Sequence, residues 1–98
     1  MPAYVVVTRE KARDASELDR YKQLAPPSFK EYPAMIRAIH GRTEVLEGSA
    51  VEDIVILEFP TYEDAKAWFQ SSTYQATSKH RHQGGDYRFI LTEGTSTH

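Results

Sequence analysis

The sequence contains no cysteine among its 98 residues. This absence excludes disulfide bonds, thiol nucleophiles and thiolate metal sites, and it fits a reducing compartment. The sequence also has no large excess of either positive or negative charge, because it contains 12 Lys and Arg residues and 14 Asp and Glu residues. The resulting net charge of −2 argues against nucleic acid or an anionic membrane as a partner. Long apolar runs and a secretory signal are absent too, so we expect a cytoplasmic protein without a membrane partner.

Motifs of common enzymes and cofactor sites are missing as well. There is no glycine-rich phosphate loop, no G-x-S-x-G elbow and no H-E-x-x-H helix, so we expect no standard hydrolase and no cofactor. His80 and His82 are two positions apart on an expected helix and splay around it. We therefore expect no metal site.

The sequence does have the composition of one globular domain, with 40% hydrophobic and 27% charged residues. A chain of this length builds a single hydrophobic core. We expect one domain over residues 1–98, of which 93–98 form a frayed tail.

Four segments have the composition of β-strands. Two of them are apolar at both odd and even positions, which is typical of strands buried on both faces. Residues 43–48 could extend the second strand. The expected strands are 3–8, 34–40, 54–59 and 87–92.

Helices are expected between these strands. Asp14 is a capping residue for a helix that Pro26 and Pro27 break, and Pro27 could open a further turn. Thr61 caps a second helix. Residues 71–73 predict the start of a new helix, and we expect a third helical segment over 74–82.

This order, β-α-β-β-α-β, predicts an α+β fold of the ferredoxin-like type, with a four-stranded antiparallel sheet and its helices on one face. The strands offer apolar side chains to both faces of the sheet. A twofold partner that packs its own open face on this one would cover the second face. We therefore expect a homodimer, in the form of a dimeric α+β barrel.

The middle of the chain resembles the signature of a mostly bacterial family known as domain of unknown function 1330 (DUF1330). The signature is similar to E-F-P followed by A-x-x-W-[YF]-x-S-x-x-Y. The resemblance covers nearly the whole chain and implies a dimeric α+β barrel, but no established reaction. Pro33 and Ala34 depart from it, because the family usually has two glycines there. The matching residues are Glu58, Phe59, Pro60, Ala65, Trp68, Phe69, Ser71 and Tyr74, with Arg81 further on.

Two residues are candidates for acid–base catalysis. Glu58 interrupts an apolar strand, and a partly buried carboxylate can act as a general base. The alternative is a structural ion pair, with Arg81 as the candidate partner. His40 lies at the end of the second strand, where an imidazole could move a proton, or could simply face solvent.

Four further residues are candidates for ligand binding. Trp68 and Tyr74 could line an aromatic pocket between sheet and helices, although helical spacing predicts the same residues in the core. Arg81 or Arg42 could orient an anionic group of the ligand.

Three functions remain open on this basis. The first is a dimeric protein that binds a small, partly apolar organic molecule between sheet and helices. The second is a cofactor-independent enzyme similar to the monooxygenases and isomerases that use such barrels, which rests on analogy of fold. The third is a non-catalytic accessory or structural dimer.

Overall fold

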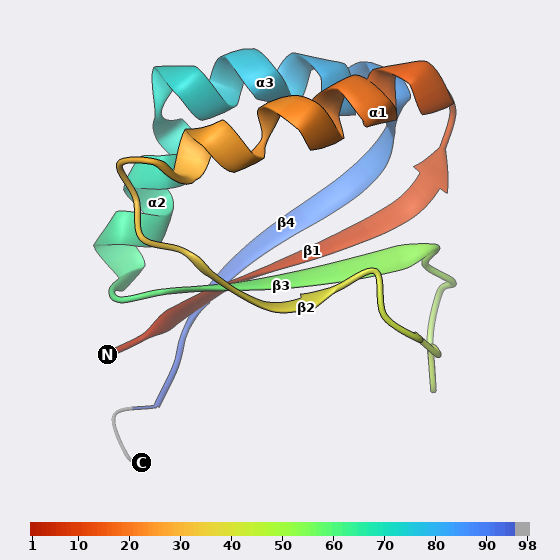
Figure 1. The fold of residues 1–98 in the computed structure, drawn as a ribbon. Coiled ribbons are helices and arrows are strands. Elements are labelled where there is room, and N and C mark those ends of the chain that lie inside the picture. Colours follow the sequence, from red (N-terminus) through yellow and green to blue (C-terminus); the bar gives the residue numbers. More distant parts are fainter. Residues whose placement is uncertain (96–98) are drawn as a thin grey trace.

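The computed structural model describes residues 1–95 of the chain, which form a four-stranded antiparallel sheet and three α-helices (Figure 1). The strands lie in the order β2-β3-β1-β4. Element order and sheet together confirm the expected ferredoxin-like α+β fold. The elements are β1 (Ala3–Ala12), α1 (Ala15–Leu24), the 3-10 helix η1 (Pro26–Phe29), β2 (Met35–Ile39), β3 (Asp53–Phe59), α2 (Tyr62–Gln70), α3 (Ser72–Gly84) and β4 (Gly85–Glu93).

Side-chain caps begin the three α-helices where the sequence predicts them. The Asp14 carboxylate accepts hydrogen bonds from the first turn of α1, the Thr61 hydroxyl accepts one from the Asp64 N–H, and Ser71 both ends α2 and caps α3. Pro26 stops α1, and the chain continues as one 3-10 turn. These breaks let α1 and α3 run side by side above the sheet (Figure 1).

The hydrophobic core lies between the helices and one face of the sheet. Along β1, Ala3, Val5 and Val7 are buried, whereas the residues between them are only partly so. The buried core also includes Leu57, Phe59, Ala65, Trp68 and Tyr74.

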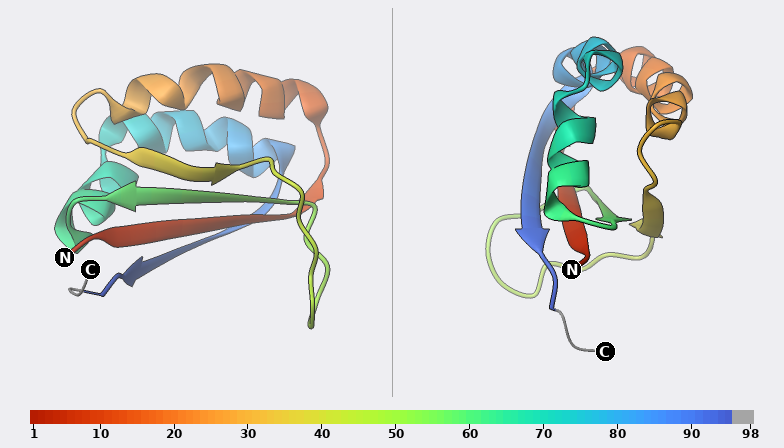
Figure 2. Two further views of the ribbon diagram at one scale, coloured as in Figure 1. Left: turned by 60° about the horizontal axis from the view of Figure 1, so that its bottom comes forward. Right: turned by 90° about the vertical axis from the view of Figure 1, so that its left-hand side faces the viewer.

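The opposite face of the sheet has apolar residues at its centre and carries no helix in the described part of the chain (Figures 1 and 2). Val6 pairs in register with Ile56 on β3 and with Ile90 on β4, and it lies between two buried valines. These side chains therefore project away from the helices. Ile90 remains 43% exposed.

Gly84 joins the end of α3 to the start of α1. Its carbonyl accepts hydrogen bonds from the N–H groups of Arg13 at 2.7 Å and Asp14 at 3.1 Å. A Cβ at this position would lie 2.5 Å from Cδ2 of Leu18, so glycine is what allows α1 to approach so closely.

Some boundary expectations are wrong. β1 continues past the expected end at Thr8 to Ala12. Residues 43–48 do not extend β2, because His40 leaves the strand with a φ of 52° and residues 41–52 form a loop. The loop projects to the side of the sheet opposite the helices, and its Leu46 is 89% exposed (Figures 1 and 2). The expected tail begins too early as well, because β4 extends to Glu93 and the Gly94 N–H donates to the Pro2 carbonyl at 2.7 Å. The rest of that tail, 96–98, lies outside the described residues.

The expected absence of membrane-spanning segments can be checked against the helices. Within residues 1–95, none of them has both the length and the apolar character that crossing a bilayer requires.

Candidate functional site

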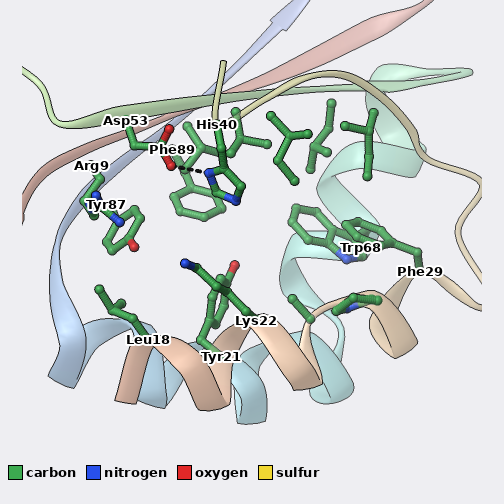
Figure 3. Close-up of a pocket in the computed structure, with 17 residues that line it drawn as sticks. Arg9, Leu18, Tyr21, Lys22, Phe29, His40, Asp53, Trp68, Tyr87 and Phe89 are labelled. Carbon is green, nitrogen blue, oxygen red and sulfur yellow. Dashed lines mark hydrogen bonds and ion pairs between the residues drawn. The ribbon is translucent and has the colours of Figure 1, made fainter. Parts of the chain in front are cut away.

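A cavity of about 260 Å³ lies between the covered face of the sheet and the helices α1 and η1 (Figure 3). This volume is near the lower end of the range for ligand pockets, so it suits a small molecule. The lining residues Ile36 and Ile39 on β2 are about half exposed, which means that the cavity reaches solvent at this edge of the sheet.

One end of the cavity is apolar and rigid. Trp68 is only 1% exposed, and its ring stacks on that of Phe29 with centroids 5.1 Å apart. Its indole N–H donates to Ser28 Oγ at 3.0 Å, which fixes the orientation of the ring. Leu57 and Ile36 complete this apolar wall. Such a wall favours a flat hydrocarbon or aromatic surface.

The other end carries a histidine–carboxylate pair. Nδ1 of His40 contacts Oδ2 of Asp53, the first residue of β3. The second ring nitrogen of His40 faces the cavity (Figure 3). A carboxylate at Nδ1 favours the tautomer whose Nε2 is an unprotonated acceptor, so this nitrogen is placed to take a proton from a bound molecule.

Two cations and a phenol lie beside this pair. Arg9 pairs with Glu52 at 3.3 Å, and the ammonium group of Lys22 points into the cavity (Figure 3). Burial raises the pKa of Tyr87, and its hydrogen bond with Arg9 opposes this rise. The polar end can therefore hold a negatively charged or strongly polar group of a ligand.

Tyr21 connects the cavity with a buried polar cluster behind its wall. The hydroxyls of Tyr21 and Tyr74 lie 2.7 Å apart, and burial raises the pKa of both phenols. Arg81 lies next to Tyr74 and packs its guanidinium over the Phe89 ring, 4.2 Å from the centroid.

The structure brings together some of the residues singled out from the sequence and separates others. His40 and Trp68 line the cavity, whereas Tyr74 and Arg81 lie behind its wall. Arg42 lies in the exposed loop after β2 and is not part of the lining.

Glu58 lies on the open face of the sheet, outside the cavity. Its Oε1 accepts a hydrogen bond from Arg37 Nε at 2.8 Å, so the expected partner Arg81 is wrong. The reason is strand geometry. Glu58 lies between Leu57 and Phe59, which are buried against the helices, so its side chain points to the other face.

Sequence reasoning missed Arg9, Asp53, Tyr87, Tyr21 and Lys22. Arg9 is paired in register with Asp53 on β3 and with Tyr87 on β4, so three strand residues meet at one end of the sheet. The signal available in the sequence was the change from apolar to polar residues at this end of each strand.

Metal ligation has no support in the described residues. Across positions 1–95 there is no group of three or more His, Asp or Glu side chains that could hold an ion. His80 instead pairs with Glu17 at 2.6 Å between α3 and α1.

The two buried phenols predict a loss of stability at high pH. Both pKa values are raised above the model-compound value of 10.0, so the unfolded chain loses these protons at a lower pH than the folded protein does. The contribution of these phenols to the free energy of unfolding is therefore constant well below about pH 10 and falls above it, by up to about 1.4 kcal/mol per pH unit for each phenol. Urea unfolding followed by Trp68 fluorescence at several pH values measures this slope.

Tyr74→Phe removes one of the two phenols. The variant should lose about 1 kcal/mol at neutral pH with its hydrogen bond, yet its stability should fall less steeply above about pH 10. Curves that stay parallel from neutral to alkaline pH would show that Tyr74 does not resist ionisation in the folded protein.

Comparison with known proteins agrees with the fold. A protein of unknown function from Rhodopseudomonas palustris has a TM-score of 0.77 at 16% identity, over 98% of this chain and 84% of that chain. A dimeric ferredoxin-like protein of unknown function from Bacteroides fragilis has a TM-score of 0.61 at 16% identity, over 95% and 96%. SnoaB, a cofactor-independent oxygenase from Streptomyces nogalater, has a TM-score of 0.63 at 8% identity, over 98% and 94%.

At these identities the structural similarities establish the fold alone. No curated protein matches the sequence. The DUF1330 family, a domain of unknown function, matches residues 2–95. Because this match spans nearly the whole chain, the protein belongs to the DUF1330 family.

Proposed function

We propose that the protein binds a small organic molecule with an apolar body and one polar end in the cavity between the sheet and α1. The observation that carries this proposal is the division of one cavity into two ends. Phe29 and Trp68 form an apolar end, and His40, Asp53 and Lys22 gather at the other (Figure 3). A small number of polar groups in an otherwise apolar pocket is the common design of ligand sites.

Filling the cavity should abolish binding. Val55 on β3 lines the cavity, whereas the next residue, Ile56, faces the open side of the sheet. With 4-nitroanisole as an aromatic probe, wild type should show saturable quenching of Trp68 fluorescence with one site per chain. Val55→Phe should weaken this binding by at least about tenfold, which corresponds to about 1.4 kcal/mol.

Ile56→Phe is the matched control, because it adds the same ring to the same strand on the other face. Its affinity for the probe should equal that of wild type. Equal weakening by both substitutions would place the probe outside the cavity. No saturable quenching with 4-nitroanisole or with a wider set of aromatic metabolites would favour the accessory or structural dimer instead.

A second candidate function is cofactor-independent proton transfer, and the pair His40–Asp53 specifically favours it. A histidine held by a carboxylate at one nitrogen, with the other nitrogen facing a cavity, is the arrangement of a general base. The fold is shared with the cofactor-independent oxygenase SnoaB. The molecule bound in the cavity would then be a substrate that loses a proton to His40.

Replacing His40 should stop such a reaction without unfolding the protein. The test measures, by NMR in deuterium oxide, exchange of the protons next to the carbonyl in a set of enolisable aryl ketones. His40→Asn should lower the rate by about 100-fold or more. The control is His80→Asn, because His80 also pairs with a carboxylate but lies between α1 and α3. Equal exchange rates in wild type and His40→Asn would contradict the assignment of His40 as the general base.

We also propose that two chains pair through the open face of the sheet to form a homodimer. The face exposes the aligned side chains of Val6, Ile56 and Ile90, and the loop bearing the exposed Leu46 projects to the same side. The Bacteroides fragilis protein of the same fold is described as dimeric. Burial of an apolar face of this kind is the usual driving force for association.

A charge on the open face should separate the chains. Ile90→Lys places an unpaired ammonium in the proposed interface and should raise the dimer dissociation constant more than about 100-fold. Leu24→Lys on α1 is the matched control, because Leu24 is 41% exposed and Ile90 43%. Native mass spectrometry gives the subunit count of each. A monomeric wild type, or a dimer lost equally in both variants, contradicts the proposal.

A further inference from the structure

Arg81 is a buried cation without a counter-ion among the described residues. The residue is 5% exposed, and its Nε has no hydrogen-bond partner within residues 1–95. In the same part of the chain it forms no ion pair. Burying a guanidinium without a carboxylate partner costs desolvation free energy. A buried arginine of this kind therefore indicates that a negatively charged group binds near it.

The surroundings of Arg81 hold it in place but do not neutralise it. Its guanidinium packs on the rings of Phe89 at 4.2 Å and Tyr87 at 5.6 Å, two residues that also line the cavity. Nη2 donates to Nε2 of His82 at 3.0 Å. Burial and the charge of Arg81 both lower the pKa of His82, which keeps that nitrogen an acceptor.

Two tyrosines connect Arg81 with the cavity. The charge of Arg81 opposes the rise in the pKa of Tyr74, and the Tyr74 hydroxyl lies 2.7 Å from that of Tyr21. Tyr21 lines the cavity and directs its hydroxyl toward the interior (Figure 3). Either hydroxyl of this pair can be the donor, and when Tyr74 donates, the Tyr21 proton is free to donate into the cavity. Such a chain of donors strengthens the last hydrogen bond.

The charges around this position leave an excess of positive charge. Asp53 contacts His40, and Glu52 pairs with Arg9, so both nearby carboxylates have partners. Lys22 and Arg81 have no ion pair within the described residues, and Lys22 points toward the same space as Tyr21 (Figure 3). The Tyr21 hydroxyl and the Lys22 ammonium thus face the second ring nitrogen of His40 across the polar end of the cavity.

We infer that Arg81, Tyr74 and Tyr21 form an oxyanion site, and that the ligand is a phenol or enol bound through its ionised oxygen. This inference rests on the proposed binding function of the cavity. The ligand O–H bond breaks, the proton goes to Nε2 of His40, and the electron pair stays on the ligand oxygen. Asp53 stabilises the imidazolium, and the oxygen accepts a hydrogen bond from Tyr21 beside Lys22.

A phenol or enol fits the donors better than a carboxylic acid does. A carboxylic acid is already ionised at neutral pH and needs no base such as His40. A carboxylate also binds best to an arginine fork that it touches with both oxygens, whereas Arg81 lies behind the cavity wall and acts through a single hydroxyl.

Matched probes test the inference. The anion of 4-nitrophenol absorbs visible light, 4-nitroanisole is its neutral methyl ether, and 4-nitrobenzoate carries a carboxylate. Wild type should bind 4-nitrophenol mainly as the anion, with its pKa lowered by about one unit or more, which is a tenfold preference for the ionised form. Absorbance titration gives the ionised fraction, and calorimetry gives the affinity.

Three variants separate a site from a structural role. Arg81→Met and Tyr21→Phe should each lose at least about tenfold of the preference for the anion, measured against the affinity of the same variant for 4-nitroanisole. Lys79→Met removes an exposed cation from the same helix and should change neither value. Should Arg81→Met fail to fold, Tyr21→Phe carries the test, because it keeps the ring and removes only the donor.

The outcomes distinguish this inference from the proposed function. If 4-nitrophenol, 4-nitroanisole and the wider set of aromatic metabolites all fail to bind, the cavity is not a ligand site and both proposals fail. If both bind and the phenol stays neutral, or if 4-nitrobenzoate binds more tightly than 4-nitrophenol, the oxyanion site is overturned and the binding function stands.

Discussion

Trp68 joins the elements on which the cavity depends. Its ring contacts Phe29 of η1, Phe59 of β3 and Tyr74 of α3, and its N–H is bonded to Ser28. Because one side chain on α2 touches three other elements, the distance between sheet and helices is set at this point, and aromatic packing of this kind resists compression. The cavity is the space that remains farther along the sheet, between α1 and the strands. Loss of Trp68 would therefore alter the shape of the site as well as the stability of the fold.

The polar end of the cavity has a different origin, which is the antiparallel register of the strands. Arg9 is brought opposite both Asp53 and Tyr87, while His40 enters from the end of β2 through a left-handed backbone conformation. Charged groups of this kind are stable in a half-buried place only when they are paired, and Arg9–Glu52 and His40–Asp53 are paired. Arg81 is the exception within residues 1–95, and its lack of a counter-ion there is the basis of the proposed oxyanion site.

The fold is shared with proteins of 8% to 16% identity, among them an oxygenase and proteins of unknown function. A fold shared this widely does not by itself determine function. The DUF1330 signature lies largely on β3, α2 and α3, and its residues have different surroundings in the structure. Trp68 and Tyr74 support the cavity wall, whereas Glu58 pairs with Arg37 on the face where a second chain is proposed to pack. The resemblance thus covers residues of the core, of the cavity wall and of the open face alike.

From local patterns alone, the sequence predicts the order of the elements, the caps at Asp14, Thr61 and Ser71, and the apolar centre of the second face of the sheet, because periodicity and capping act over a few neighbouring residues. It also identified His40 and Trp68 among the candidates. The tertiary structure alone decided which groups meet. A strand that is apolar at both odd and even positions does not reveal which face of the sheet holds Glu58. Positions as distant as 9, 53 and 87 become neighbours only through strand pairing. The chemistry of the site thus depends on long-range register, which local patterns do not encode.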